Sequence, residues 1–181
     1  MPPTEKARAR IIDPEEQLLA QQIKNQDKKS FETLVVRFSR RMYRQAFLIL
    51  ESPGDAEDAI QEVFVKAYLG MSQYKGGSLF AWLATINHHH CIDLLRKSKR
   101  ELPEVKNPTE NLFSTIPQKE TDTIGEILVK LSENEREVVH LRVIENLEYA
   151  EIAEVTGLAE GSLRNILSKS LRKLREQGEK S

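Results

Sequence analysis

The sequence has 181 residues, 39% hydrophobic and 30% charged, which is enough for one compact domain or two small ones. The net charge is −1, so no global basic excess indicates nucleic-acid binding, and the single cysteine, Cys91, excludes an internal disulfide framework. No apolar run approaches the roughly 20 residues of a transmembrane helix. The charged residues 1–12 predict a flexible arm rather than a secretory signal, and we expect a soluble cytoplasmic protein.

Two helices are predicted after this arm. The first runs from Asp13 to about Asn25: Asp13 suits the N-cap, Pro14 the first helical position, and Glu16 completes a capping box. The second begins near Asp27. Its apolar residues keep roughly helical spacing and predict a buried stripe: Phe31, Leu34, Val35, Phe38, Met42, Phe47 and Leu50.

Two further helices complete a first helical domain. A break at residues 52–54 precedes a third helix, from Pro53 to Leu69, with Gly70 as its stop. A glycine-rich turn at residues 76–78 leads into a fourth helix that ends near Lys97. The inner face of the third helix is predicted to consist of Ala56, Ala59, Ile60, Val63, Phe64 and Ala67. We place this domain at residues 13–100.

The second half of the chain predicts a linker and a second helical domain. Helical periodicity stops over residues 101–121, which carry three prolines, so this segment is interpreted as an interdomain linker. In the domain expected at residues 122–181, one helix lies around residues 124–131, and a capping box at Ser132 opens the next, which runs toward Glu145. Helices at 148–156 and 160–177 follow. The predicted fold is therefore all-α, with two small domains.

Residues 149–168 have the layout of a DNA-binding helix-turn-helix. Gly157 tolerates the positive φ of the turn, and Leu158, Leu163 and Ile166 pack the second helix onto the first. The residues predicted to face outward are Glu160, Gly161, Arg164, Asn165 and Lys169. Arginine and asparagine in this position can pair with base edges in the major groove. An ordinary helical hairpin is the alternative interpretation.

Charge is segregated within the first domain. The start of the third helix carries acidic residues without a basic one among them: Glu51, Asp55, Glu57, Asp58 and Glu62. The end of the fourth helix carries basic residues after three histidines: His88, His89 and His90, then Arg96, Lys97, Lys99 and Arg100. Complementarity to the helix dipoles explains the signs but not the lengths of these runs. They predict an acidic patch for a basic protein partner and a basic patch for phosphate.

Three aromatic residues lie near the glycine-rich turn, just ahead of the basic run: Tyr74, Phe80 and Trp82. Aromatic faces beside cations suit unstacked single-stranded bases. Phe80 and Trp82 are open to a second interpretation, as apolar anchors of the core. Tyr74 lies on the loop, where we expect it to be exposed.

Three segments, taken in order, resemble the bacterial sigma-70 family of transcription initiation factors, of the extracytoplasmic-function type. Residues 55–68, DAEDAIQEVFVKAY, resemble the region-two signature that binds the coiled coil of the polymerase β′ clamp. Residues 80–86 and 91–97 look like the promoter-melting and minus-ten helices of that domain. The helix-turn-helix with residues 171–175 is similar to region four, which reads the minus-thirty-five element and grips the β flap. One departure is His89, where that group usually has asparagine.

The resemblance implies a factor that binds core RNA polymerase and promoter DNA, commonly with an anti-sigma partner, without a cofactor or catalytic residue of its own. The residues expected at the polymerase are Asp55, Asp58, Gln61 and Glu62. Those expected at minus-ten DNA are Tyr74, Trp82, His89, Arg96, Lys97 and Arg100. Those expected at minus-thirty-five DNA are the five outward residues of the helix-turn-helix.

Two other classes of protein remain as alternatives. A stand-alone helix-turn-helix regulator would bind duplex DNA without polymerase. An enzyme would have to use His88, His89, His90, Cys91 or Asp93, but no cofactor loop or nucleophile–base pair accompanies them. Adjacent helical residues point about 100° apart, so the three histidines cannot converge on one metal ion, and we expect no metal. We expect them instead to add partly protonated charge to the basic patch.

Overall fold

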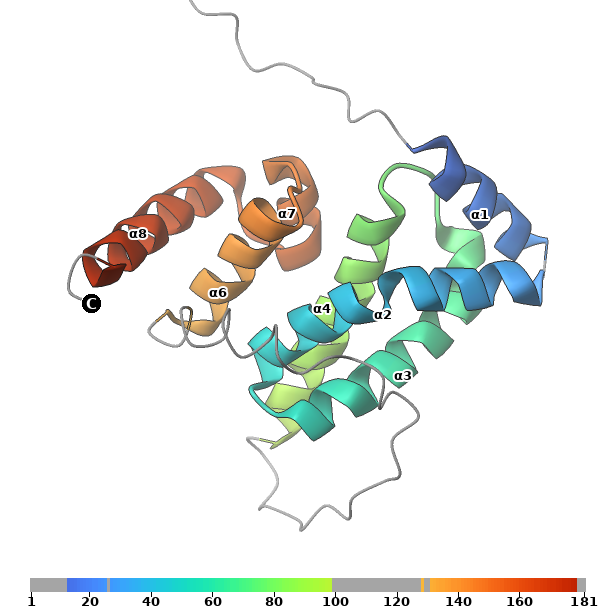
Figure 1. Ribbon diagram of the computed structural model, residues 1–181, viewed down its shortest axis with the longest axis horizontal. Coiled ribbons are helices and arrows are strands. Elements are labelled where there is room, and N and C mark those ends of the chain that lie inside the picture. Colours follow the sequence, from blue (N-terminus) through green and yellow to red (C-terminus); the bar gives the residue numbers. More distant parts are fainter. Residues whose placement is uncertain (1–12, 26, 99–127, 129–130, 179–181) are drawn as a thin grey trace, which may run out of the picture.

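The computed structural model describes residues 13–25, 27–98, 128 and 131–178. Their regular structure is helical and forms two groups of helices (Figure 1). The first group contains α1 (Pro14–Lys24), α2 (Lys28–Leu50), α3 (Pro53–Gly70), the 3-10 turn η1 (Met71–Gln73) and α4 (Leu79–Ser98). The second contains α6 (Glu133–Val139), the π-helical turn η2 (His140–Ile144), α7 (Tyr149–Thr156) and α8 (Glu160–Gly178). The predicted arm and linker lie outside the described residues.

Local sequence signals account for most helix starts in the first group. The carboxylate of Asp13 accepts a hydrogen bond from the backbone N–H of Glu15 at 2.9 Å, and Asp27 and Ser52 cap α2 and α3 in the same manner. The predicted inner face of α3 is confirmed, since all six of its residues are buried. In α2 the apolar stripe centres on Leu34, Phe38 and Met42, which have no exposed surface. The three long helices pack around this shared core.

Two predicted details at helix ends differ from the structure. The capping box at Glu16 is wrong: its Oε2 accepts from the N–H of Leu79, 3.2 Å away, and so caps α4 instead of its own helix. Gly70 is the last residue of α3, as predicted, but its φ is −90°, and the chain continues directly into η1. A left-handed glycine stop is therefore absent at this helix end.

The second group begins as predicted and then departs from a regular helix. The side chain of Ser132 and that of Glu135 form the expected capping box at the start of α6. The helix predicted to continue toward Glu145 instead widens into η2, a π-helical turn that opens with His140. His140 has no exposed surface, so the turn places a titratable ring inside the protein.

The two helix groups pack against each other. Helix α7 lies against α4, and α6 lies against α2, so segments far apart in the chain are neighbours (Figure 1). The buried apolar residues of both groups form one continuous cluster. None of the described helices has the length and apolar character required to cross a membrane.

Candidate polymerase and nucleic-acid interfaces

The outer face of α3 carries the predicted acidic residues. Asp58, Gln61 and Glu62 are exposed, and Asp55 is half-buried at the start of the helix. Val65 and Leu69 continue the same face and are 60% and 74% exposed. Sequence reasoning missed these two apolar residues, although their spacing from Asp58 and Glu62 follows the helical repeat. We call this acidic and apolar strip, residues 58, 61, 62, 65 and 69, the α3 strip.

An apolar groove of about 400 Å³ runs beside the α3 strip, between α2 and α3. It is lined by Lys28, Phe31, Glu32, Phe64, Val65, Tyr68 and Leu69. The ring of Phe31 contacts that of Tyr68 edge-on, with centroids 4.9 Å apart. Exposed apolar surface next to charge is typical of a surface that binds another protein.

The end of α4 presents the predicted basic side chains to solvent. Arg96 and Lys97 are exposed, and Arg96 lies 3.6 Å from Asp93 one turn earlier. His89 is also exposed, while Trp82 is half-buried. Arg100 lies outside the described residues. The end of α4 is therefore a cationic surface, and the half-buried Trp82 lies about four turns earlier on the same helix.

The expectation that Tyr74 is exposed is wrong. Its side chain is 4% exposed, its hydroxyl donates to the carbonyl of Gly77 at 2.7 Å, and its ring meets Trp82 edge-on at 5.6 Å. Burial raises the pKa of the hydroxyl, with a smaller contribution from Glu16. Lys24 Nζ donates to the backbone carbonyl of Tyr74 and ties the loop to α1. Tyr74 is therefore an anchor of the loop and not a stacking surface for DNA.

We expect the change Tyr74→Ala to destabilise the protein by about 3 kcal/mol, because it removes a buried aromatic ring. Tyr74→Phe keeps the ring and loses only the hydrogen bond to Gly77, which is worth about 1 kcal/mol. Urea unfolding followed by circular dichroism measures both. Parental stability of the alanine variant would contradict the anchoring role.

Two of the three histidines, His88 and His90, are buried and do not lie in the exposed basic patch, contrary to the prediction. His90 is buried; its Nδ1 accepts from Lys66 Nζ at 2.6 Å, and its Nε2 lies 3.3 Å from Glu62. Burial, and then the charge of Lys66, lower the pKa of His90, so it favours the neutral form. His88 is buried against Glu137 of α6. His89 alone of the three is exposed.

No metal site is formed by these groups. Within the described ranges, no three histidine, cysteine or acidic side chains are arranged to hold an ion. Cys91 is buried, and burial raises the pKa of its thiol to about 12. Its S–H points to the side-chain oxygen of Asn87 at 3.6 Å, which makes it a packing residue with little thiolate.

The buried ring of His140 makes stability depend on pH. Burial, followed by the charges of Arg44 and Arg41, lowers the pKa of His140 to about 3. The unfolded chain takes up this proton near pH 6.5, so the unfolded state binds more protons between these values. The contribution of the neutral His140 ring to the free energy of unfolding is therefore fully present above about pH 6.5, and it is lost progressively as the pH drops below that value.

We expect the free energy of unfolding to fall by about 2 kcal/mol between pH 6.5 and pH 5, since one pH unit is worth up to about 1.4 kcal/mol. The lowered pKa of His90 adds a smaller loss of the same sign. The change His140→Leu should remove at least half of this slope. Urea titrations at both pH values give the result, and an unchanged slope would contradict it.

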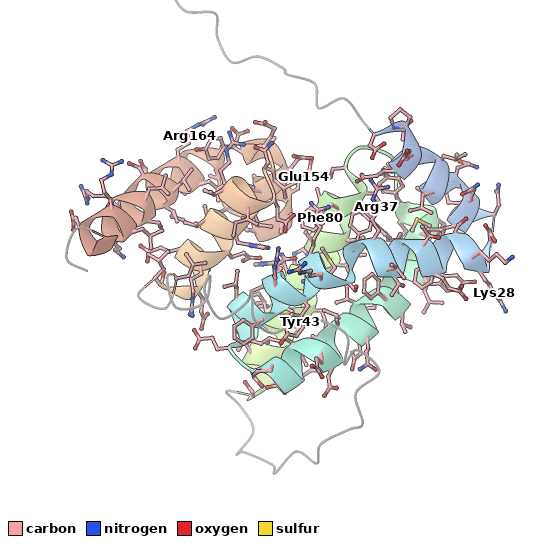
Figure 2. All side chains as sticks on the ribbon, in the orientation of Figure 1. Lys28, Arg37, Tyr43, Phe80, Glu154 and Arg164 are labelled. Carbon is pink, nitrogen blue, oxygen red and sulfur yellow. The ribbon has the colours of Figure 1, made fainter. Side chains whose placement is uncertain are left out.

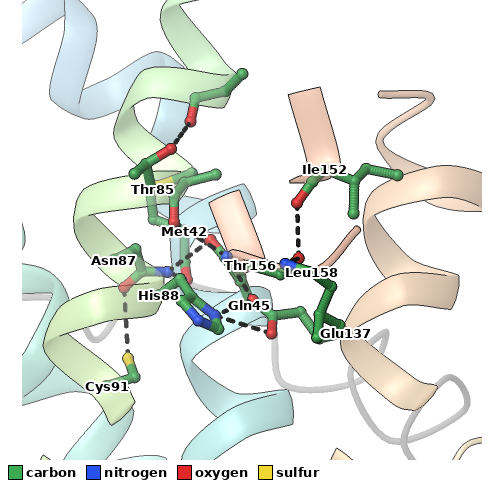
Figure 3. Close-up of polar contacts among 12 residues, drawn as sticks. Met42, Gln45, Thr85, Asn87, His88, Cys91, Glu137, Ile152, Thr156 and Leu158 are labelled. Carbon is green, nitrogen blue, oxygen red and sulfur yellow. Dashed lines mark hydrogen bonds and ion pairs between the residues drawn. The ribbon is translucent and has the colours of Figure 1, made fainter. Parts of the chain in front are cut away.

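Helices α7 and α8 form the predicted helix-turn-helix. Gly157 has a φ of 72°, as the turn requires, and Ile152 and Leu163 have no exposed surface between the helices. Thr156, which stands where an apolar residue is usual, donates to the carbonyl of Ile152 and accepts from the N–H of Leu158. Its hydroxyl thus connects the end of α7 to the turn (Figure 3).

The outer surface of α8 carries the predicted side chains. Gly161, Arg164, Asn165 and Lys169 are exposed, and Glu160 is half-exposed. Figure 2 shows Arg164 projecting from this surface.

Arg164 is held in place before any ligand binds. Its guanidinium is 3.0 Å from Glu160 and 4.7 Å from the ring centre of Tyr149. Arg142 lies 5.1 Å from the same ring. Sequence reasoning missed Tyr149, because its role depends on contacts between three helical segments. An arginine ordered in this manner loses less entropy on pairing with a base.

Two family models match the chain, one over the helices that carry the α3 strip and the basic end of α4, the other over the helix-turn-helix. The model of sigma-70 region 2 matches residues 34–101, and that of sigma-70 region 4 matches residues 121–174. The protein is a sigma-70 family sigma factor. Curated relatives named ECF sigma factors support the extracytoplasmic-function type. Sigma factors are non-enzymatic transcription initiation factors, and this one acts with RNA polymerase in promoter-directed transcription initiation.

Curated relatives of this sigma factor match most of its length. RNA polymerase sigma factor YlaC of Bacillus subtilis is 28% identical over 162 residues, covering 84% of this chain and 94% of the relative. ECF RNA polymerase sigma-E factor of Escherichia coli is 27% identical over 170 residues, covering 83% and 87%. ECF RNA polymerase sigma factor SigK of Mycobacterium sp. (strain KMS) is 26% identical, covering 83% and 84%.

Solved structures share the fold of this sigma factor. CnrH, in complex with the cytosolic domain of CnrY, superposes with a TM-score of 0.68 at 23% identity, over 91% of this chain and 97% of CnrH. The sigma factor RpoE of Bartonella quintana, crystallised with the anti-sigma factor NepR, superposes with a TM-score of 0.63 at 22% identity, over 82% and 96%. Both likenesses confirm the all-α fold.

Proposed function

We propose that the α3 strip binds the β′ clamp of core RNA polymerase. Three exposed residues of the predicted set, Asp58, Gln61 and Glu62, share this face, and Asp55 stands at its start. The exposed side chains of Val65 and Leu69 supply apolar area that a protein partner can bury. Because the inner face of α3 is buried in the core, substitutions on the strip can change binding without removing core contacts.

The end of α4 binds the non-template strand of the opened minus-ten element in this proposal. Arg96, Lys97 and, by the family resemblance, Arg100 contact phosphates. Trp82 and His89 are the aromatic rings on which unstacked bases stack. Helix α8 enters the major groove at the minus-thirty-five element, where Arg164 and Asn165 contact base edges. The observation that carries this proposal is the exposed Arg164–Asn165 pair on a complete helix-turn-helix.

The domain boundaries expected from the sequence, 13–100 and 122–181, are part of this proposal, and the matched family regions, 34–101 and 121–174, overlap them. Since CnrH and RpoE were each solved with a protein partner, one of them an anti-sigma factor, we propose an anti-sigma partner here as well. Such a factor acts in the cytoplasm, where its polymerase is found.

Affinity capture on core polymerase tests this function. The purified protein should retain core polymerase, and the complex should melt promoter DNA, as detected by permanganate reactivity of unpaired thymines. A stand-alone regulator would instead bind duplex DNA tightly without polymerase. That result, with no capture of polymerase, would overturn the proposal.

A further inference from the structure

The buried carboxylate of Glu137 contacts two helices of the first domain. Glu137 of α6 is 3% exposed, and its Oε1 accepts from Gln45 Nε2 of α2 at 3.0 Å. Both of its carboxylate oxygens lie 2.9 Å from His88 Nδ1 of α4. Figure 3 shows these side chains converging between the two helix groups. Glu137 is 92 positions from Gln45 in the sequence and 49 positions from His88.

The first domain is organised to receive this carboxylate. Asn87 Nδ2 donates to Gln45 Oε1 at 2.9 Å and to the carbonyl of Met42 at 3.0 Å, which fixes the orientation of the Gln45 amide. The Gln45 NH₂ group then donates to the carbonyl of Ala84 and to Glu137. Gln45 and Asn87 have no exposed surface. The donors are therefore held in place by the first domain itself.

Further charged contacts surround this site. Arg41 Nε of α2 donates to Glu145 Oε2, just after η2, at 2.6 Å, and Glu145 is 4% exposed at its side chain. Arg136 of α6 pairs with Glu51 at the end of α2. The Arg41 guanidinium also lies 3.6 Å from the ring centre of Phe80. When the domains separate, water can bond to each of these polar groups. The surface that separation exposes is therefore partly polar and not apolar alone.

The two domains, packed against each other as in this structure (the docked arrangement), are smaller across than the separation of the two promoter elements on DNA. The minus-ten and minus-thirty-five positions are 25 base pairs apart by definition, which is about 85 Å along B-form DNA. A compact chain of 181 residues has a radius of gyration of about 16 Å and so a diameter of about 40 Å. The docked domains therefore cannot hold both elements at once.

We infer that the docked form is a resting state, closed by the insertion of Glu137 into the donor site of His88 and Gln45. We call this contact the Glu137 latch. It gives His88, which the sequence assigned to the basic patch, a role outside DNA binding. The functional consequence rests on the proposed function: the latch must open before α4 and α8 engage one promoter together.

Energy transfer within the free protein measures docking directly. Trp82 is the only tryptophan of the chain and serves as donor in the first domain. An acceptor dye is attached to the exposed position of α8 by Ser168→Cys. Cys91 is buried with a raised pKa, so it reacts little with the dye reagent. No polymerase or DNA is present, so the result does not depend on sigma activity.

The change Glu137→Lys places an ammonium against the donors and is expected to lower the transfer efficiency at least twofold. His88→Glu, on the other domain, should do the same by opposing two carboxylates. The double variant exchanges the charges and should recover the transfer. Glu154→Lys, the same charge change at an exposed position of α7 (Figure 2), is the matched control and should leave transfer unchanged.

Unchanged transfer in both single variants, with helical circular dichroism retained, would overturn the latch. If Glu137→Lys lost its helical signal, His88→Glu would decide, because it alters the other domain. Transcription at limiting core polymerase tests the consequence: if nine in ten molecules are docked, opening should raise apparent affinity about tenfold. Opening without any rise would overturn the resting-state role, whereas a parent protein inactive in transcription would overturn only the proposed function.

Discussion

Reversing the charge of Asp58 or Glu62 is expected to abolish assembly with core RNA polymerase. Both side chains are exposed on the α3 strip, so each variant should keep its fold and its helical circular dichroism. Juxtaposed like charges cost several kcal/mol at an interface, and about 2.8 kcal/mol corresponds to a 100-fold loss of affinity. We therefore expect Asp58→Lys and Glu62→Lys to bind core polymerase at least about 100-fold more weakly.

Glu62 also lies 3.3 Å from His90, so Glu62→Lys additionally changes a contact within the first domain. Glu154→Lys carries the same charge change on α7 and should bind core polymerase normally. Binding is measured by fluorescence anisotropy with labelled protein. Normal binding by both variants would remove the α3 strip from the polymerase interface.

Arg164→Ala is expected to relax the preference for particular bases of the minus-thirty-five element. A bidentate arginine–guanine pair is worth about 1–3 kcal/mol of discrimination, which corresponds to roughly 5- to 150-fold between promoter variants. Arg164 is already positioned by Glu160 and Tyr149, so its loss should not be compensated by a neighbouring side chain. Transcription from a panel of single-base promoter variants measures the change.

Lys169→Ala is the comparison for this experiment. Lys169 lies on the exposed side of α8, one turn beyond Asn165, where it can reach a phosphate. Its loss should lower activity about equally on all promoters and flatten the dependence on salt. If Arg164→Ala also scaled every promoter by one common factor, Arg164 would be a phosphate contact and not a base contact.

Several features that depend on a single helix or turn were predicted correctly from local sequence signals. The inner face of α3 follows from apolar spacing alone, and the turn at Gly157 follows from the need for a positive φ. The cap at Ser132 follows from the serine and the glutamate three residues later. These features depend on residues close together in the chain, which is why the sequence predicts them.

Residues whose partners lie far away in the chain were predicted poorly. Glu16 caps α4 across 63 positions, and His88 meets Glu137 across 49, so local patterns carry no information about either pair. Tyr74 looked exposed because it lies in a loop, but Gly77 and Trp82 enclose it. The docking of the two domains was likewise unpredictable, since it depends on polar pairs that only the fold brings together.

Run-off transcription with reconstituted core polymerase tests the central claim most directly. The template is a pool of promoters with randomised minus-thirty-five and minus-ten elements, and the transcripts are sequenced. We predict that the protein selects a defined pair of elements, that core polymerase alone does not, and that Asp58→Lys gives no selected transcripts. Transcripts that are the same with and without the protein would contradict its assignment as a promoter-specific initiation factor.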